Sequence, residues 1–454
     1  MPKRQSAIFW FYFWMLSAIF LTGWFLYWNT FNQGTSATIG KIINLLPIEW
    51  EQKREYQALV KLGDYFLGKN KEEKTLLVLF QNNLEIRPGG GFLGAFSVIK
   101  IKNGNIVSME MHDLSDFDTQ IPNVIESPYP IKEIMRTTFW KMRDSNFSPD
   151  FTVNAQKAQD FYYLGQGSQY FDGVIGITAN TLTSMLKVTG PVSIEGYPGT
   201  YDSENAIIAL EYQVEQAFDD QGIPREKRKS VINDLAKEIE KRIFLLSTYQ
   251  KIELAKILIQ NLKQKDIQLY FKDAALQKIV EDANWSGEVD QQWASDYLMI
   301  IDANLGAFKS DYYIKRSVDY TITLLKNNPI AHLKITYEHT AKQKDWMTRD
   351  YLTYLRIYVP DNSWFISGSN FDNPQFGKEF NKKYFGAIVK VPIGTTKTVE
   401  ISYAIPEELT QNYILKIQKQ AGINNEPVNA HVIRENGSKN DYSYIMNNDL
   451  IIKN

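Results

Sequence analysis

The 454-residue sequence contains no cysteine and only four histidines. The absence of cysteine excludes disulfide bonds, thiolate metal sites and cysteine nucleophiles, so packing and polar contacts must hold the fold. The histidines lack metal-ligand spacing, and neither a G-x-S-x-G nor an H-E-x-x-H motif occurs, which leaves protease and lipase chemistry without its residues. Because 50 basic residues face 52 acidic ones, the charge balance gives no indication of nucleic-acid binding.

Charge is also missing from the N-terminal region, between Arg4 and Lys41. Residues 7–28 are almost wholly apolar, and a helix of about 33 Å over them would cross a bilayer core of ~30 Å. Tryptophan and tyrosine crowd both ends, as is typical of membrane interfaces. The stretch is longer than the apolar part of a cleaved signal peptide. Since Lys3 lies with Arg4 in the flank 1–6, we expect a cytoplasmic N-terminus and a single-pass cell-membrane protein whose bulk is extracytoplasmic.

The next part of the chain predicts a stalk and a layered α/β domain. Apolar residues at helical spacing favour a helical stalk within 29–74. Residues 75–325 alternate strand and helix patterns, which predicts a mixed sheet with covering helices. Their clearest local feature is Asn103-Gly104, which predicts a hairpin between AFSVIKIK and NIVSMEM. Residues 204–265 are helical throughout, and LMIIDAN and SDYYIKRSVDYTITL are assigned to strands of the same domain.

The C-terminal part of the sequence has a different texture. From residue 326 to 454, alternating β-branched and aromatic runs such as LKITYEHT, YLTYLRIYVP and KTVEISYAIP are separated by Pro, Gly and Asn turns. Helical periodicity is absent from these runs. The sequence therefore predicts an all-β, Ig-like sandwich as the second domain.

The segment IRPGGGFLG contains a basic residue and a glycine run. A strand and a hairpin follow Gly89, Gly90 and Gly91, whereas a dinucleotide site needs a helix N-terminus at that point, so we exclude nicotinamide cofactors. The glycines can form a backbone cradle for an anion, with Arg87 as a bidentate partner for phosphate or carboxylate. They can equally form a tight crossover in which Arg87 pairs with a structural acid. The residues leave both interpretations open.

Two charged segments are further candidates for ligand contacts. Asp113 and Asp116 lie in HDLSDFD after a predicted strand, where clustered carboxylates can hold Mg²⁺ or simply cap turns in solvent. Arg225, Arg228 and Lys229 open a predicted helix. Cations at that end oppose the helix dipole, which favours an anionic partner there, although a solvated basic face is the alternative.

The order of these segments resembles a known family. LLVLFQNNLEIRPGGGFLGAFSVIKIKNGNI, FDGVIGITANTLTSMLKVTGPVSI and NWSGEVDQQWASDYLMIIDANLGAFKSDYYI together look like domain of unknown function family 4012, which occurs in membrane-anchored bacterial proteins. The resemblance covers roughly residues 75–365, and the motifs N-x-E-x-R-x-x-G-G-F and D-G-V-I carry it. The family name implies no activity.

A weaker resemblance to the LytR-CpsA-Psr family follows from the running order of strand, Arg-bearing loop, hairpin, acidic loop, D-G-V-I-x-I, G-P-V and basic helix entry. That family transfers glycopolymers from polyprenyl-pyrophosphate carriers to the cell wall. The resemblance implies catalytic roles for Arg87, Asp113, Arg225 and Arg228. It further implies Mg²⁺ on Asp113 or Asp116. Gly89, Gly90 and Gly91 in the anion cradle and Lys229 in the basic helix entry are the predicted ligand-binding residues.

Two functional hypotheses follow. In the first, the α/β domain binds a phosphorylated or lipid-linked glycan or cell-wall polymer, as a phosphotransferase of the LytR-CpsA-Psr type. In the second, the chain is a non-enzymatic envelope scaffold or adhesion protein with a vestigial enzyme fold. A pocket in which Arg87, Arg225 or Arg228 faces Asp113 would favour the first hypothesis. A glycine loop buried under other elements would favour the second.

Overall fold

The computed structural model describes most of the chain after the predicted membrane span, in residues 43–44, 47–67, 72–224, 228–326 and 328–453. The predicted transmembrane segment 7–28 and Arg225 lie outside the described residues. Among helices within the described ranges, none is long and apolar enough to cross a membrane.

The α/β part is built on a five-stranded mixed sheet of order β3-β2-β1-β4-β5. Its strands are β1 (Lys74–Asn82), β2 (Phe92–Lys102), β3 (Asn105–Asp113), β4 (Gly173–Thr178) and β5 (Ile267–Phe271). β1 runs parallel to β4, and the other neighbours are antiparallel. The predicted hairpin is confirmed: Asn103 and Gly104 join β2 to β3 with φ of 51° and 78°, as a two-residue turn with positive φ requires.

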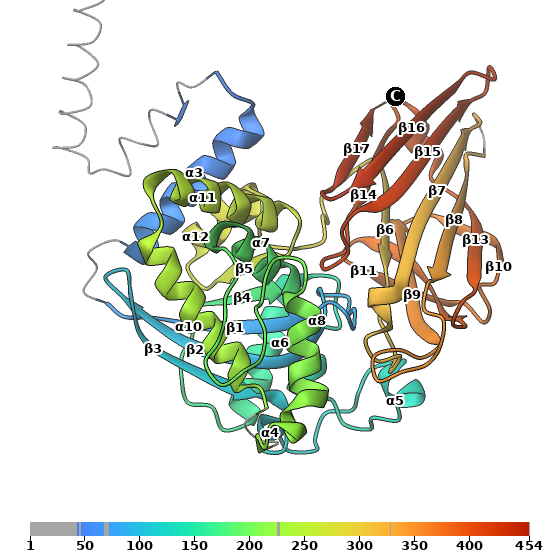
Figure 1. The fold of residues 1–454 in the computed structure, drawn as a ribbon. Helices are drawn as coiled ribbons and strands as arrows, with labels where there is room; N and C mark the ends of the chain where they lie inside the picture. Colours follow the sequence, from blue (N-terminus) through green and yellow to red (C-terminus); the bar gives the residue numbers. More distant parts are fainter. Residues whose placement is uncertain (1–42, 45–46, 68–71, 225–227, 327, 454) are drawn as a thin grey trace, which may run out of the picture.

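Helices cover both faces of this sheet. Alternate residues of β1 point to opposite faces and therefore pack in two different cores. Leu77 and Leu79 pack with α6 (Phe151–Leu164) on one face. Leu76 and Val78 pack on the other face. The helices of that second core are α3 (Trp50–Leu67), α11 (Thr248–Lys263) and α12 (Ala274–Asp282). The helix predicted in the stalk is therefore present as α3, but it packs on the domain instead of standing apart from it (Figure 1).

The remaining helices form a smaller layer with its own core, which includes Leu186, Leu210 and Leu235. It contains α7 (Ala179–Thr189), α8 (Ala206–Tyr212), the π-helical turn η2 (Gln213–Ala217), α9 (Phe218–Asp220) and α10 (Ser230–Leu245). The short elements α4 (Leu114–Phe117), α5 (Ile131–Ile134) and η1 (Met142–Asp144) lie between β3 and α6. The helical region predicted at 204–265 is confirmed. Val192, in the segment after α7, makes only an isolated bridge to Tyr201.

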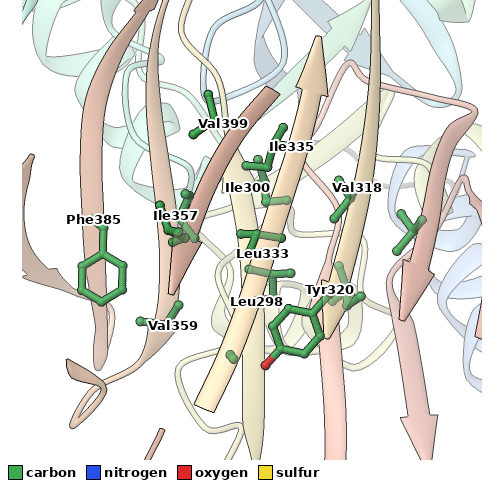
Figure 2. Close-up of a cluster of buried hydrophobic side chains, with 14 of the residues drawn as sticks. Leu298, Ile300, Val318, Tyr320, Leu333, Ile335, Ile357, Val359, Phe385 and Val399 are labelled. Carbon is green, nitrogen blue, oxygen red and sulfur yellow. The ribbon is translucent and has the colours of Figure 1, made fainter. Parts of the chain in front are cut away.

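The C-terminal part is a sandwich of two six-stranded mixed sheets. The first sheet contains β10 (Trp364–Ser369), β13 (Thr396–Ala404), β8 (Ile330–His339), β7 (Ile314–Leu324), β15 (Glu426–Arg434) and β16 (Lys439–Met446). The second contains β11 (Gln375–Glu379), β12 (Lys382–Val391), β9 (Tyr351–Pro360), β6 (Asp296–Ile301), β14 (Ile414–Gln418) and β17 (Leu450–Lys453). Figure 2 shows side chains of both sheets, such as Leu298 and Val318, meeting in one core.

Two details of the predicted division are wrong. β6 and β7, assigned from sequence to the α/β domain, are central strands of the two sandwich sheets. A buried apolar run looks the same in either domain, and only non-local pairing decides between them. The sandwich is also not purely antiparallel as an Ig-like fold would be, since β6 pairs parallel with β14 and β7 with β15.

The two parts meet at a close backbone contact. Gly422, in the connection between β14 and β15, has φ +81°, and a Cβ there would lie 2.0 Å from the carbonyl oxygen of Gly90. Beside it, the Gln420 side chain donates to the carbonyl oxygens of Arg87 (3.2 Å) and Asp302 (2.7 Å). The loop after β1 and the loop after β14 are thus in direct contact, with no room for a side chain between them.

This contact gives a stability prediction. Gly437 has the same φ of +81° but open space around its Cβ position. Gly437→Ala should cost only the positive-φ strain, about 1–2 kcal/mol. Gly422→Ala adds overpacking against Gly90, so we expect it to cost at least ~2 kcal/mol more. Urea denaturation of the two full-length variants measures the difference; equal costs would show that the contact yields without strain.

Candidate functional site

Arg87, the first predicted site residue, is buried and fully engaged. Its Nε lies 3.4 Å from Asp144 Oδ1, and its Nη1 donates to the carbonyl oxygen of Asn304 at 2.9 Å. Its guanidinium also stacks over the Phe92 ring, with 5.3 Å between the guanidinium carbon and the ring centroid. Arg87 therefore joins η1, β2 and the loop after β6, as in the interpretation that pairs it with a structural acid.

The glycines after Arg87 are buried as well. A Cβ on Gly91 would lie 2.5 Å from the backbone of Asn82, and one on Gly89 would lie 2.5 Å from the Asn154 amide. The Gly89 amide already donates to the carbonyl oxygen of Asn146 at 3.0 Å. The glycines are needed for close packing of chain on chain. This geometry favours the tight crossover over an open anion cradle.

Asp113 and Lys229 come together from segments 116 residues apart. Lys229 Nζ lies 2.7 Å from Asp113 Oδ1 and 2.8 Å from the carbonyl oxygen of Gly94, so the start of α10 is fixed to the β2–β3 hairpin. The Ser115 amide also donates to Asp113, which caps α4. Burial opposes ionisation of this carboxyl, but Lys229 and the Ser115 amide hold its pKa below the ordinary value. Its carboxylate is thus satisfied by protein groups.

Asp116 is exposed in α4. Within the described ranges of the chain, no group of three or more carboxylate or imidazole side chains is arranged to hold a metal ion. The Mg²⁺ site predicted on Asp113 and Asp116 stays a prediction, and the contacts of Asp113 describe a cap and an ion pair.

Arg228 belongs to a separate cluster centred on Lys309, a residue of the loop between β6 and β7. Lys309 Nζ lies 3.2, 3.4 and 3.7 Å from carboxylate oxygens of Glu85, Glu211 and Glu215. Arg228 Nη1 lies 3.4 Å from the other oxygen of Glu215. Burial raises the pKa of Glu211 to about 7, although Lys309 opposes this. The cluster ties a sandwich loop to α8 and η2, so Arg228 also has a structural partner.

The structure therefore brings Asp113 and Lys229 into contact and places Arg87 and Arg228 in two other ion-pair clusters. Arg225 lies outside the described residues. The catalytic roles proposed for these residues stay predictions.

A different feature has the shape of a binding site: a cleft of about 720 Å³ between the two parts of the molecule. On the α/β side, the turn after β1, the first half of α7 and the start of α8 line it, and α8 is the helix that faces the sandwich in Figure 1. On the other side it is lined by β7, β8, the start of β13 and the connection between β14 and β15. No single domain could form this cleft alone.

The sandwich wall of the cleft follows from strand register. Lys315 of β7 is the cross-strand partner of Glu338 in β8, which in turn partners Thr396 in β13. Ser317 and Thr336 are paired in the same way. Because side chains alternate across a strand, these residues share the outer face of the first sheet, while Arg316 points inward. The wall is thus a polar grid of hydroxyl, carboxylate and amine groups.

The opposite end of the cleft contains a network of amides around a buried carboxylate. Asp266 accepts from Asn180 (2.9 Å), Asn424 (2.8 Å) and Thr178 (2.7 Å), and Asn83 donates to Asn180 (3.1 Å). The Oδ1 atoms of Asn83 and Asn424 are buried with no hydrogen-bond partner. Unpaired buried acceptors are costly, so a donor that reached them would be favoured.

The lining of the cleft is acidic. Its two cations are Lys315 and Arg316. They are outnumbered by five carboxyl groups, those of Glu204, Asp302, Asp311, Glu338 and Glu426. Arg316 is paired with both Asp302 and Glu426, which leaves Glu204, Asp311 and Glu338 against Lys315. Such a lining disfavours a pyrophosphate. Its amides, hydroxyls and carboxylates suit a neutral or cationic molecule with many hydroxyl groups.

Asp311 at the edge of the cleft has an unusual ionisation. It accepts hydrogen bonds from the Ile86 amide (3.0 Å) and from the Asn304 side chain (2.7 Å). Burial raises the pKa of Asp311 to about 7, because these hydrogen bonds only partly offset the desolvation of the carboxylate.

Sequence reasoning did not find the cleft residues. Asn83 and Asn424 are 341 positions apart in the chain, and no motif connects them. The only local signals were the pairs Asn82-Asn83 and Asn424-Asn425 at strand ends, which are also ordinary turn composition.

Fold and site together define a class: a mixed α/β unit joined rigidly to a two-sheet sandwich, with a polar cleft between them. Residues 71–214 match the model of a family described as "Protein of unknown function (DUF4012)". This supports the first resemblance, over a shorter range than the expected 75–365. No curated protein matches the chain.

Solved structures similar to the chain include three bacterial proteins. They are Lin1025 from Listeria innocua (11% identity, TM-score 0.28, covering 48% of this chain and 80% of that one), gbs0355 from Streptococcus agalactiae (14%, 0.29, 48% and 74%) and TagV from B. subtilis (10%, 0.27, 48% and 81%).

The environment of Arg87 predicts a structural phenotype. Arg87→Met leaves Asp144 buried without its partner, so the free energy of unfolding should fall by ~3–5 kcal/mol. Lys132→Met removes an exposed pair with Glu126 and should leave the free energy of unfolding nearly unchanged. Denaturation curves of both full-length variants test this, and an Arg87 variant as stable as wild type would contradict the structural role.

The raised pKa of Asp311 predicts that the stability of the fold decreases as pH rises. Between about pH 4 and pH 7 the folded protein keeps a proton that the unfolded chain has lost, so stability should decline as pH rises through this window and level off above it. We expect a decline of about 1–2 kcal/mol between pH 5 and pH 8. Asp311→Asn, which keeps an acceptor for Ile86, should reduce the slope of the profile in thermal unfolding, and the raised pKa of Glu211 should leave a smaller decline over the same window. An unchanged slope in this variant would assign the effect to other groups.

Proposed function

We propose that this chain is a non-enzymatic, membrane-anchored protein of the cell envelope that holds a neutral or amino-bearing glycan in the cleft between its α/β part and its sandwich. The observation that carries the proposal is the composition of the cleft. Two walls from different parts of the chain present amide, hydroxyl and carboxylate groups around about 720 Å³.

The chemistry of these groups matches sugar hydroxyls. A hydroxyl both donates and accepts, so it can satisfy a carboxylate such as Glu338 and an amide such as Asn425 at once. Tyr312, an exposed aromatic residue in the lining, offers a flat apolar surface beside the polar groups. The combination of polar grid and aromatic edge supports carbohydrate over a purely apolar ligand.

The electrostatics argue against the phosphotransferase hypothesis. Transfer from a pyrophosphate needs free cations or a metal where negative charge develops. Arg87 is paired with Asp144, Arg228 with Glu215 and Lys229 with Asp113. The cleft itself is acidic. The second hypothesis, a non-enzymatic envelope protein, is therefore the one we carry forward, and its envelope location rests on the predicted span at 7–28.

Ligand binding can be tested with defined probes. The full-length protein in detergent micelles is titrated with a tetramer of N-acetylglucosamine, a tetramer of glucosamine and inorganic pyrophosphate, and binding is followed by saturation-transfer NMR. We expect signals from one or both sugars and none from pyrophosphate, because the lining is acidic.

A matched pair of variants locates the site. Thr336→Trp fills the cleft, whereas Lys334→Trp places the same side chain two residues earlier on the same strand and face, outside the lining. Thr336→Trp should abolish the sugar signals and Lys334→Trp should retain them. If pyrophosphate binds to the wild type and not to Arg87→Met, the phosphotransferase hypothesis is restored. If neither sugar binds, the proposal is overturned.

A further inference from the structure

The corner between α10 and α11 exposes apolar side chains to solvent. Leu245 at the end of α10 is 84% exposed, and Tyr249 and Ile252 in the first turns of α11 are 72% and 52% exposed. Their neighbours Leu246 and Leu254 are buried, so the corner packs on the rest of the protein through these two side chains and leaves an apolar outer face in solvent. The capping box of Ser247 with Gln250 fixes the start of α11 and hence the direction of this face.

Helix α3 extends the same surface. Lys263 of α11 lies 2.9 Å from Glu55 and 3.9 Å from Glu51, which joins the two helices. Lys256, exposed on α11, lies near enough to both Tyr249 and Tyr56 of α3 to interact electrostatically with each. The surface therefore combines leucine, isoleucine and tyrosine with lysine. We call Leu245, Tyr249, Ile252, Tyr56 and Lys256 the corner patch.

The position of the corner patch relative to the chain entry is informative. Lys53 of α3 donates to the carbonyl oxygen of Asn44 at 2.9 Å, so the first described residues lie beside the first half of α3. Trp50, which opens α3, is 66% exposed. The segment 29–42 separates Ile43 from the predicted membrane span and can reach at most about 50 Å when fully extended. Lys263, at the other end of α11 from Tyr249, lies beside the first half of α3, so the patch is about one length of α11, ~24 Å, from the chain entry and within the reach of this segment.

We propose that the corner patch rests on the bilayer surface, and that it fixes the orientation of the exported part relative to the membrane. Tyrosine, leucine and isoleucine at a headgroup boundary bury apolar surface while the tyrosine hydroxyls stay hydrated. Lys256 is already paired with Glu253 at 2.8 Å, so burial of the apolar side chains carries the contact. The predicted anchor would keep the patch close to the bilayer, so that even a small buried apolar area would be enough to hold it there. The inference rests on the predicted anchor and is independent of ligand binding in the cleft.

The absence of cysteine allows a site-specific test in the full-length chain. Leu245→Cys carries an environment-sensitive nitrobenzoxadiazole label, and the protein is reconstituted into phosphatidylcholine vesicles containing phosphatidylglycerol. Val124→Cys is the control, since Val124 is 66% exposed and lies between α4 and α5, at the end opposite α3 and α11 in Figure 1. We expect a blue-shifted emission that nitroxide-labelled lipid quenches at position 245, and neither effect at position 124.

A second set of variants separates the bilayer from other partners. Tyr249→Glu with Ile252→Glu should abolish the shift and the quenching at position 245, because carboxylates resist transfer into the interface. Equal quenching at positions 245 and 124 would overturn the proposal. So would a shift that depends on protein density and not on nitroxide lipid, which would indicate a second copy of the chain. Failure of the chain to float with vesicles overturns it as well, because the patch requires the anchor.

Discussion

The fold depends on a backbone contact that excludes side chains, where the loop after β1 meets the loop after β14. A Cβ at Gly422 would lie 2.0 Å from the carbonyl oxygen of Gly90, so a side chain at this position would displace the loop after β1. Around them, Arg87, Gln420 and Asn304 satisfy each other's polar atoms across the junction. The two parts of the molecule are therefore in direct contact at this junction, beside the cleft that both of them line.

This junction also explains why so many cations are paired. A rigid contact between two polar loop systems buries charged side chains, and a buried charge is tolerated only when it is paired and hydrogen-bonded. Arg87, Lys309 and Arg316 each meet at least one carboxylate at the boundary between the parts. Of the basic residues that suggest phosphate chemistry in the sequence, Arg87 joins the two parts, whereas Arg228 and Lys229 pair with carboxylates of the α/β part. The carboxylates left over, such as Glu204 and Glu338, make the cleft acidic.

Local features of the fold were predictable from the sequence, and non-local ones were not. The β2–β3 hairpin, the helices of 204–265 and the strand-rich C-terminus follow from turn chemistry and periodicity, which act over a few residues. The place of β6 and β7 depends on partners more than 50 residues away in β9 and β14 or β15, and their apolar runs fit either domain. The same limit applies to the site. Arg87 was found by its residue type, but its partner Asp144 is a plain acid in the sequence.

The helices connect the cleft to the proposed membrane face. α7 lines the cleft and packs against both α10 and α11, whose shared corner forms the patch. The far end of α10 is fixed to the β2–β3 hairpin through Lys229 and Asp113. A bilayer that holds the corner therefore holds α7 through direct packing, without any flexible joint among the described residues of these elements. With the proposed contact, an anchor at the predicted span 7–28 would position the cleft at a set height and angle above the membrane, which the segment 29–42 alone would not do.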